Sequence, residues 1–183
     1  IFYSMISIVG IDGLIPTLKL IKFSRNIAIV NKECLVCGWS LIKKKLNFNK
    51  TNFIPIDSEH YSLNSILDKV NTRQIKNIYI TASGGPFLNN PHIKKKSILV
   101  NDALKHPNWK MGKKISIDSS TLMNKVFEVI EAKNIFDVAY EKINILTHPM
   151  SYVHSIVEFD NGLIKIVAHQ PKMEIPISSS LID

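Results

Sequence analysis

The sequence predicts an α/β fold, because short apolar runs alternate with longer amphipathic segments along its 183 residues. Hydrophobic residues make up 45% of the chain and charged residues 21%, which is typical of a globular protein with a sizeable core. A chain of this length forms one large domain or two small ones. No internal repeat or low-complexity segment interrupts the pattern.

The first part of the chain predicts three strands, each followed by a helix. Strands are expected where apolar residues run continuously, at 5–9, 27–30 and 53–56. Helices are expected where the apolar spacing becomes helical, at 14–22, 33–45 and 61–70. Lysines lie at the C-terminal end of the helix expected at 33–45, where the helix dipole favours cations.

The second part of the chain predicts more strands. They are expected at 75–81, 115–117, 142–147, 152–159 and 163–168. Asp160-Asn161-Gly162 separates the last two strands and indicates a tight hairpin. Asp118 is a suitable N-cap for a helix that follows it. Residues 87–113 carry few periodic signals and predict a long functional loop, and the tail beyond Gln170 predicts an extended exit.

The formal charge of +8 suits an anionic partner, either nucleic acid, an anionic surface or small anions. The abundance of Lys, Asn and Ile, which AT-rich codons favour, is an alternative cause of this excess. The lysine runs at 43–45 and 94–96 lack interleaved aromatic residues or arginines. We therefore expect solvated charge at these runs and no nucleic-acid partner.

Two cysteines, Cys34 and Cys37, lie in an apolar run. A lone C-x-x-C lacks the second pair of ligands of a zinc site, so two buried thiols are expected in preference to a redox pair. The scarcity of cysteine fits a reducing compartment.

The N-terminal residues 1–18 are apolar, but Asp12, Gly13 and Pro16 interrupt them, and the stretch is short for a membrane span. No membrane partner is expected. The chain begins at Ile1 in mid-pattern, so we expect it to be a piece of a longer protein.

Two acidic residues follow the strand expected at 53–56. Asp57 and Glu59 lie two positions apart and, in extended backbone, point the same way. Carboxylates so placed repel unless a cation or a proton lies between them. Glu128 offers a third carboxylate, and ligation by oxygen alone suits Mg²⁺ or Mn²⁺. The alternative is that Asp57 caps a helix and Glu59 is a surface acid.

The helix expected around Glu128 also offers phosphate ligands. Ser119 and Ser120 lie in its predicted first turn, where free backbone amides attract anions. Ser120, Asn124 and Glu128 follow at steps of four and share one face, with Lys125 beside them. The alternative is a capped amphipathic helix that only packs against the core.

Three further groups are candidates for the site. Ser83-Gly84-Gly85 follows a strand and is a second candidate phosphate cradle, although most such turns are merely turns. His106 and Trp109 lie in the long loop, where the indole either covers a ligand or packs on the surface. His154 lies on a strand face and is expected to be a packed core histidine.

Seven segments occur in an order and at a spacing that resemble a known family. They are AIVNKE at 28–33, PIDSEH at 55–60, SGGPF at 83–87, HPNW at 106–109, KISIDSSTLMNK at 114–125, IEA at 130–132 and His148-Pro149. On these segments, nearly the whole chain resembles the 1-deoxy-D-xylulose 5-phosphate reductoisomerases. These are metal- and NADPH-dependent enzymes of non-mevalonate isoprenoid biosynthesis.

The resemblance implies a role for each matching residue. Asp57, Glu59 and Glu128 would bind Mg²⁺ or Mn²⁺. The residues that would contact the substrate are Lys32, Ser58, Glu59, Ser83, His106, Trp109, Met111, Ser119, Asn124, Lys125 and Glu128. Its phosphate would lie against Ser83, Ser119, Asn124 and Lys125, and NADPH would touch Asn31, Glu33 and Gly112. The catalytic set would be Lys32, Asp57, Glu59, His106 and Glu128.

The resemblance also implies a domain organisation. Residues 1–56 would be the C-terminal part of a Rossmann-like NADPH-binding domain, and residues 57–183 an α/β catalytic domain with a flexible flap at 87–113. The glycine-rich dinucleotide fingerprint would precede Ile1, and a helical domain would follow Asp183.

The implied reaction converts 1-deoxy-D-xylulose 5-phosphate to 2-C-methyl-D-erythritol 4-phosphate. The metal would act as a Lewis acid on the substrate's carbonyl and hydroxyl oxygens, and a retro-aldol and aldol sequence would give an aldehyde. NADPH would reduce this aldehyde while the flap excludes water.

The resemblance further implies a homodimer. The location would be the plastid stroma if the source is a plastid-bearing parasite, and otherwise the bacterial cytoplasm. Three alternatives stay open: another metal-dependent phosphate-ester enzyme such as a phosphatase or aldolase, a basic nucleic-acid-binding module, and an inactive fragment.

Overall fold

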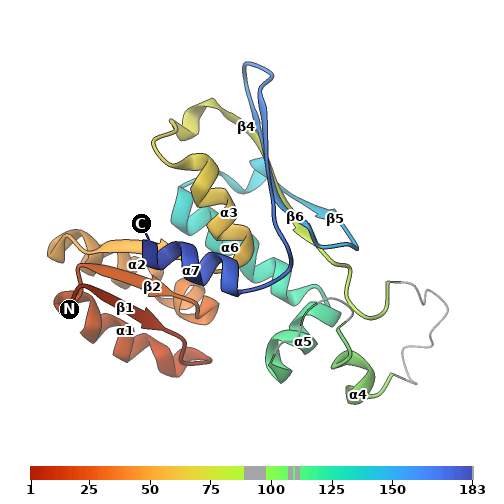
Figure 1. Ribbon diagram of the computed structural model, residues 1–183, viewed down its shortest axis with the longest axis horizontal. Helices are drawn as coiled ribbons and strands as arrows, with labels where there is room; N and C mark the ends of the chain where they lie inside the picture. The colour runs from red at the N-terminus through yellow and green to blue at the C-terminus, as the bar shows by residue number, and fades with distance from the viewer. Residues whose placement is uncertain (89–97, 107–108, 110–111, 183) are drawn as a thin grey trace.

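Two β-sheets organise the chain, and helices pack beside both of them (Figure 1). The computed structural model describes residues 1–88, 98–106, 109 and 112–182. Three early strands form one sheet in the order β1-β2-β3, and four later strands form a second in the order β5-β4-β6-β7. The α/β class predicted from the alternating pattern is confirmed.

The first sheet is parallel and is built from β1 (Tyr3–Ile6), β2 (Asn26–Ile29) and β3 (Asn52–Pro55). Parallel neighbours need crossover connections, and the helices α1 (Leu14–Leu20) and α2 (Lys32–Asn49) supply them. Short 3₁₀ turns flank α1 on both sides. Strands and helices of this unit share one apolar core.

The helix α2 is longer than the sequence pattern predicted. It continues past Lys45 because Leu46 is buried and extends the apolar face by another turn. Lys50 then ends it in the left-handed conformation, with φ of 53°. The lysine run at 43–45 is exposed on this helix, as predicted, whereas the run at 94–96 lies outside the described residues.

The second sheet pairs β4 (Ile75–Ala82) in parallel with β5 (Ile143–Thr147) and antiparallel with β6 (Val153–Phe159). The outer strand β7 (Ile164–Ala168) pairs antiparallel with β6. The hairpin predicted between these two is confirmed, and Gly162 takes the positive φ of 84° that the turn needs. The helices α3 (Ser58–Leu67) and α6 (Met123–Phe136) contribute to the core of this sheet.

The expectation from the sequence is wrong for the segment that leads into α6. The predicted strand at 115–117 is part of a helix, α5 (Lys113–Ser120), and a short helix α4 (Val100–Ala103) precedes it. Asp118 is therefore no N-cap, because it lies inside α5. Its carboxylate pairs with Lys114 one turn earlier at 2.6 Å. Leu122 separates α5 from α6 with a φ of 61°, a break that the apolar pattern does not reveal.

The expectation of an extended C-terminal tail is also wrong, because these residues form the helix α7 (Glu174–Ile182). Pro176 lies in the first turn, where the missing N–H has no partner within the helix. The helix returns to the first sheet (Figure 1), where the Ser180 hydroxyl lies 2.8 Å from that of Tyr3. Among the described residues no helix is long and apolar enough to cross a membrane.

Replacing Ile78 with Ala tests the core of the second sheet. Ile78 is 0% exposed in the central strand β4, so Ile78→Ala is expected to lower the free energy of unfolding by about 2–5 kcal/mol. Ile164→Ala on β7 is the control, because Ile164 is 55% exposed and its loss should cost below about 1 kcal/mol. Urea unfolding measures both, and equal losses would contradict this assignment of the core.

Candidate active site

A cavity of about 270 Å³ lies where strands of both sheets end. Val30, Asp57 and Ser83 follow the carboxyl ends of β2, β3 and β4 within two residues, and all three line the cavity. This edge is where ligand sites gather in open α/β sheets. The helices α5 and α6 form another wall, with Ser119, Leu122, Asn124, Lys125 and Glu128.

The three predicted metal ligands converge at this cavity. Side-chain oxygens of Asp57, Glu59 and Glu128 all lie within 4.8 Å of one another. Asp57 is the N-cap of α3, Glu59 lies in its first turn, and Glu128 projects from the middle of α6. The expectation that the first two leave an extended strand is wrong, and the helix-cap alternative holds for Asp57. Glu59 is nevertheless no surface acid, because its side chain is only 13% exposed.

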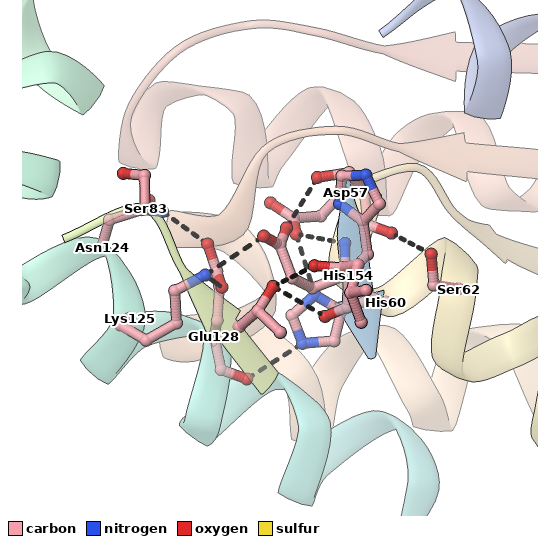
Figure 2. Close-up of polar contacts among 12 residues, drawn as sticks. Asp57, His60, Ser62, Ser83, Asn124, Lys125, Glu128 and His154 are labelled. Carbon is pink, nitrogen blue, oxygen red and sulfur yellow. Dashed lines mark hydrogen bonds and ion pairs between the residues drawn. The ribbon is translucent and has the colours of Figure 1, made fainter. Parts of the chain in front are cut away.

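Two lysines balance this negative charge. Lys32 Nζ lies 2.8 Å from Asp57 Oδ2 and 3.3 Å from Glu128 Oε1. Lys125 Nζ lies 3.2 Å from Glu59 Oε1 and 2.5 Å from Glu128 Oε2. Figure 2 shows Glu128 with Lys125 on one side. Both ammonium groups are buried, so each pair is shielded from water.

The pKa values show how closely these charges depend on one another. Burial opposes ionisation of Asp57, but the charges and hydrogen bonds of Lys32 and His60 together outweigh it and hold the pKa of Asp57 well below its usual range. Burial and the charge of Glu59 raise the pKa of Glu128, in spite of both lysines. Burial thus disfavours the ionised form of Glu128, and a divalent cation bound by the three carboxylates would stabilise it. The donor set thus fits Mg²⁺ or Mn²⁺.

The predicted phosphate ligands lie on the same cavity, although the helix start expected at Ser119 does not exist. Ser119 lies in the last turn of α5, and the first turn of α6 holds Asn124 and Lys125 instead. Ser83 and Ser119 both line the cavity, and Gly85 approaches the backbone of Ser119 so closely that a Cβ on it would be 3.0 Å from the Ser119 carbonyl oxygen. Ser120 is not brought to the cavity, and its hydroxyl donates to Ile117.

The remaining predicted substrate contacts are placed as follows. The Ser83 hydroxyl lies 3.0 Å from His106 Nε2, and both residues line the cavity. Ser58 also lines it and donates to Glu59. Trp109 lines it beside His154, with ring centroids 6.2 Å apart. Met111 and parts of the predicted flap lie outside the described residues.

The three predicted NADPH contacts lie near the first sheet and α5. The side chain of Asn31 caps α2 and donates to the carbonyls of Ile8 and Gly10, so its amide is fully used by backbone. Glu33 pairs with Lys114 of α5 at 2.8 Å. Gly112, the N-cap of α5, lines the cavity.

Sequence reasoning missed or misread several residues of the site. His154 is buried as expected, but it also lines the cavity. Ser151 and Leu122 line it with positive φ values of 56° and 61°, which non-glycine residues rarely adopt. The sequence signal for Ser151 was the nearby His148-Pro149 motif.

The two cysteines differ, which makes the prediction of two buried thiols wrong. Cys34 is buried and Cys37 is exposed. Cys34 packs in the core of the first sheet from α2. The buried face of this helix continues through Leu35, Gly38, Ile42 and Leu46, and Cys37 lies outside it.

Hydroxyl, amide and ammonium groups beside a buried carboxylate triad are the groups that a metal-dependent enzyme site for a small phosphorylated substrate would need. Comparison with known proteins gives the family. The family model for the 1-deoxy-D-xylulose 5-phosphate reductoisomerase C-terminal domain matches residues 53–136, and the 1-deoxy-D-xylulose 5-phosphate reductoisomerase model matches residues 3–38. The chain belongs to the 1-deoxy-D-xylulose 5-phosphate reductoisomerase family.

Relatives of that name come from bacteria. The chain is 58% identical to the reductoisomerase of Pelagibacter ubique over 179 residues, which covers 98% of this chain and 46% of the relative. It is 48% identical to that of Clostridium tetani over 175 residues, which covers 96% of this chain and 46% of the relative. The chain therefore spans about half the length of the curated relatives it matches.

Solved structures give the same result. A DOX-P reductoisomerase in complex with NADPH, fosmidomycin and magnesium superposes with a TM-score of 0.91 at 36% identity, covering 99% of this chain and 47% of that one. The reductoisomerase from Zymomonas mobilis in complex with NADPH gives a TM-score of 0.87 at 37% identity, covering 98% and 46%.

Removing one ammonium group tests the charge balance of the site. Lys32→Met leaves Asp57 and Glu128 buried without this counter-charge, so the free energy of unfolding without added metal should fall by about 3–5 kcal/mol. Lys43→Met, on the exposed run of α2, should change it by less than about 0.5 kcal/mol. Urea unfolding compares the two variants, and a loss in Lys32→Met no larger than the control's would refute the balance described above.

Proposed function

We propose that the protein converts 1-deoxy-D-xylulose 5-phosphate to 2-C-methyl-D-erythritol 4-phosphate with NADPH and a divalent metal, as the names of its relatives suggest. The observation that carries this proposal is the convergence of Asp57, Glu59 and Glu128 beside Ser83, Ser119 and Asn124 on one cavity. Carboxylates for a metal and polar groups for a phosphate on the same cavity match a small phosphorylated sugar.

At the metal end, Asp57, Glu59 and Glu128 would hold Mg²⁺ or Mn²⁺. The ion supplies Lewis acidity toward the carbonyl and hydroxyl oxygens of a bound substrate. Burial would lower the pKa of Lys32, but the charges of Asp57, Glu128 and Glu131 and the hydrogen bond to Asp57 together outweigh it and raise the pKa well above the usual value. Lys32 thus contributes a fixed positive charge. It therefore donates hydrogen bonds to substrate oxygens and does not take up their protons.

In the same cavity, Ser83, Ser119, Asn124 and Lys125 would bind the phosphate. Hydroxyl and amide groups donate to phosphate oxygens, and the ammonium adds charge. His106 is within hydrogen-bond distance of Ser83, and burial lowers its pKa, so it stays neutral at physiological pH and orients that hydroxyl. Contacts to the phosphate and to the metal together would fix the orientation of the sugar.

NADPH would approach from the side of the first sheet, where Asn31, Glu33 and Gly112 lie. It supplies the hydride that reduces the aldehyde. The division into a nucleotide-binding part at residues 1–56 and a catalytic part at 57–183 suits this approach, because the cavity lies between the two sheets' strand ends. Trp109 and Met111 of the flap at 87–113 would close over the substrate and exclude water.

Two further expectations belong to this proposal. The protein would act as a homodimer, as the family resemblance implies. It would act in a bacterial cytoplasm, because the relatives named above are bacterial, and nothing in them favours the plastid stroma as the alternative.

A Mn²⁺ titration by calorimetry tests the metal site. Glu59→Gln and Glu128→Gln each remove one anionic ligand, so both should weaken Mn²⁺ binding at least tenfold. Glu158→Gln is the control, because this glutamate pairs with Lys76 on the second sheet and does not line the cavity. Saturable binding of equal strength in all four proteins would remove the proposed metal site.

Consumption of NADPH tests the reaction itself. The full-length protein that contains this sequence should oxidise NADPH only when both 1-deoxy-D-xylulose 5-phosphate and Mg²⁺ or Mn²⁺ are present. Release of inorganic phosphate without NADPH oxidation would favour a phosphatase instead.

Ser119→Ala tests phosphate recognition in the same assay. Loss of one hydrogen bond to a charged phosphate should raise KM by about ten- to a hundredfold with a smaller change in kcat. Ser178→Ala, at an exposed position on α7, should leave both constants unchanged. A KM for Ser119→Ala equal to that of the control would exclude Ser119 from the phosphate site.

A further inference from the structure

One buried carboxylate near the site has no role in the chemistry above. Glu131 lies on α6 close to one turn beyond Glu128, and its side chain is 1% exposed. Neither carboxylate oxygen has a hydrogen-bond partner among the described residues. A buried carboxylate without partners is costly, so a nearby positive charge is needed to explain it.

The side chain that Glu131 faces is the imidazole of His60. Glu131 Oε2 lies 3.8 Å from His60 Nδ1, and the ring is 0% exposed. Phe136, at the end of α6, stacks parallel to the ring with centroids 6.3 Å apart. Packing against Phe136 thus fixes the plane of the imidazole ring, and its polar partners fix the rotation of the ring within that plane.

Both nitrogens of His60 contact metal-ligand residues. Nε2 lies 2.9 Å from the main-chain carbonyl oxygen of Glu128, which only accepts, so Nε2 carries a hydrogen and donates (Figure 2). Nδ1 lies 3.3 Å from Asp57 Oδ1. His60 therefore joins the N-cap of α3 to the turn of α6 that carries Glu128.

We propose that Glu131 is a positioning residue that acts through His60 to hold Asp57 and Glu128 at the spacing a divalent cation requires. Without the Glu131 carboxyl group, the imidazole loses one of the two acidic side chains that fix it, and its hold on Asp57 loosens. Partners beyond the ligands change metal affinity by about ten- to a hundredfold in other proteins. This inference rests on the metal site of the proposed function.

A second interpretation of the same residues is separable by experiment. Side-chain ligand atoms of Asp57, His60 and Glu131 also lie within 4.8 Å of one another, so they form a possible ligand set of their own. If they bound a metal directly, two Mn²⁺ ions would bind per chain. A positioning role requires one.

Mn²⁺ titration by calorimetry, on the full-length protein that contains this sequence, tests the proposal. Glu131→Gln keeps the size of the side chain and replaces its carboxyl group with an amide, and it should weaken Mn²⁺ binding about tenfold with one ion per chain. His60→Gln should weaken it similarly. The double variant should bind no more weakly than the weaker single variant, because both changes break the same chain of contacts. Glu158→Gln should bind like the parent.

Several outcomes would overturn the positioning role. Unchanged Mn²⁺ affinity in Glu131→Gln, with only a lower melting temperature, would show a purely structural residue. Additive losses in the double variant would show that Glu131 does not act through His60, and two ions per chain in the parent would show direct ligation. If circular dichroism shows that Glu131→Gln does not fold, unchanged affinity in His60→Gln overturns it equally. Failure of the parent to bind Mn²⁺ would overturn the proposed function as well.

Discussion

The structure depends on the balance of buried charge at the cavity. Three carboxylates and two ammonium groups lie together with little access to water, and none of them is stable there without the others. Their positions are fixed by α2, α3 and α6, so these three helices must keep a constant spacing. Burial, which raises the cost of each charge, also strengthens each ion pair.

The helix α6 carries this constraint to both sheets. Ala132 belongs to the core of the second sheet, whereas Ile135 packs against the core of the first. The amide of Asn134 donates to the carbonyl of Leu35 on α2, which links the two helices directly. The cavity therefore lies where both cores meet, and a change in either core would move Glu128 relative to Asp57.

Much of this architecture could be predicted from local pattern, and the errors have physical causes. The strand runs and the Asp160-Asn161-Gly162 hairpin were predictable because alternation and turn chemistry act over a few residues. The run at 115–117 is too short to distinguish a strand from a helix, and there the Lys114–Asp118 pair supports a helix. The αL break at Leu122 and the helix α7 depend on packing that no local signal encodes.

The sequence by itself determined which groups are available: the carboxylates, hydroxyls and lysines whose order also identifies the family. Only the tertiary structure decided how they meet, since Lys32 reaches Asn124 across 92 positions of sequence at 2.8 Å. It also gave Glu131 and His60 their place, because the sequence shows a glutamate and a histidine but not that both are buried together. Burial and long-range contact are properties of the folded chain, and they set the charge of every group in this site.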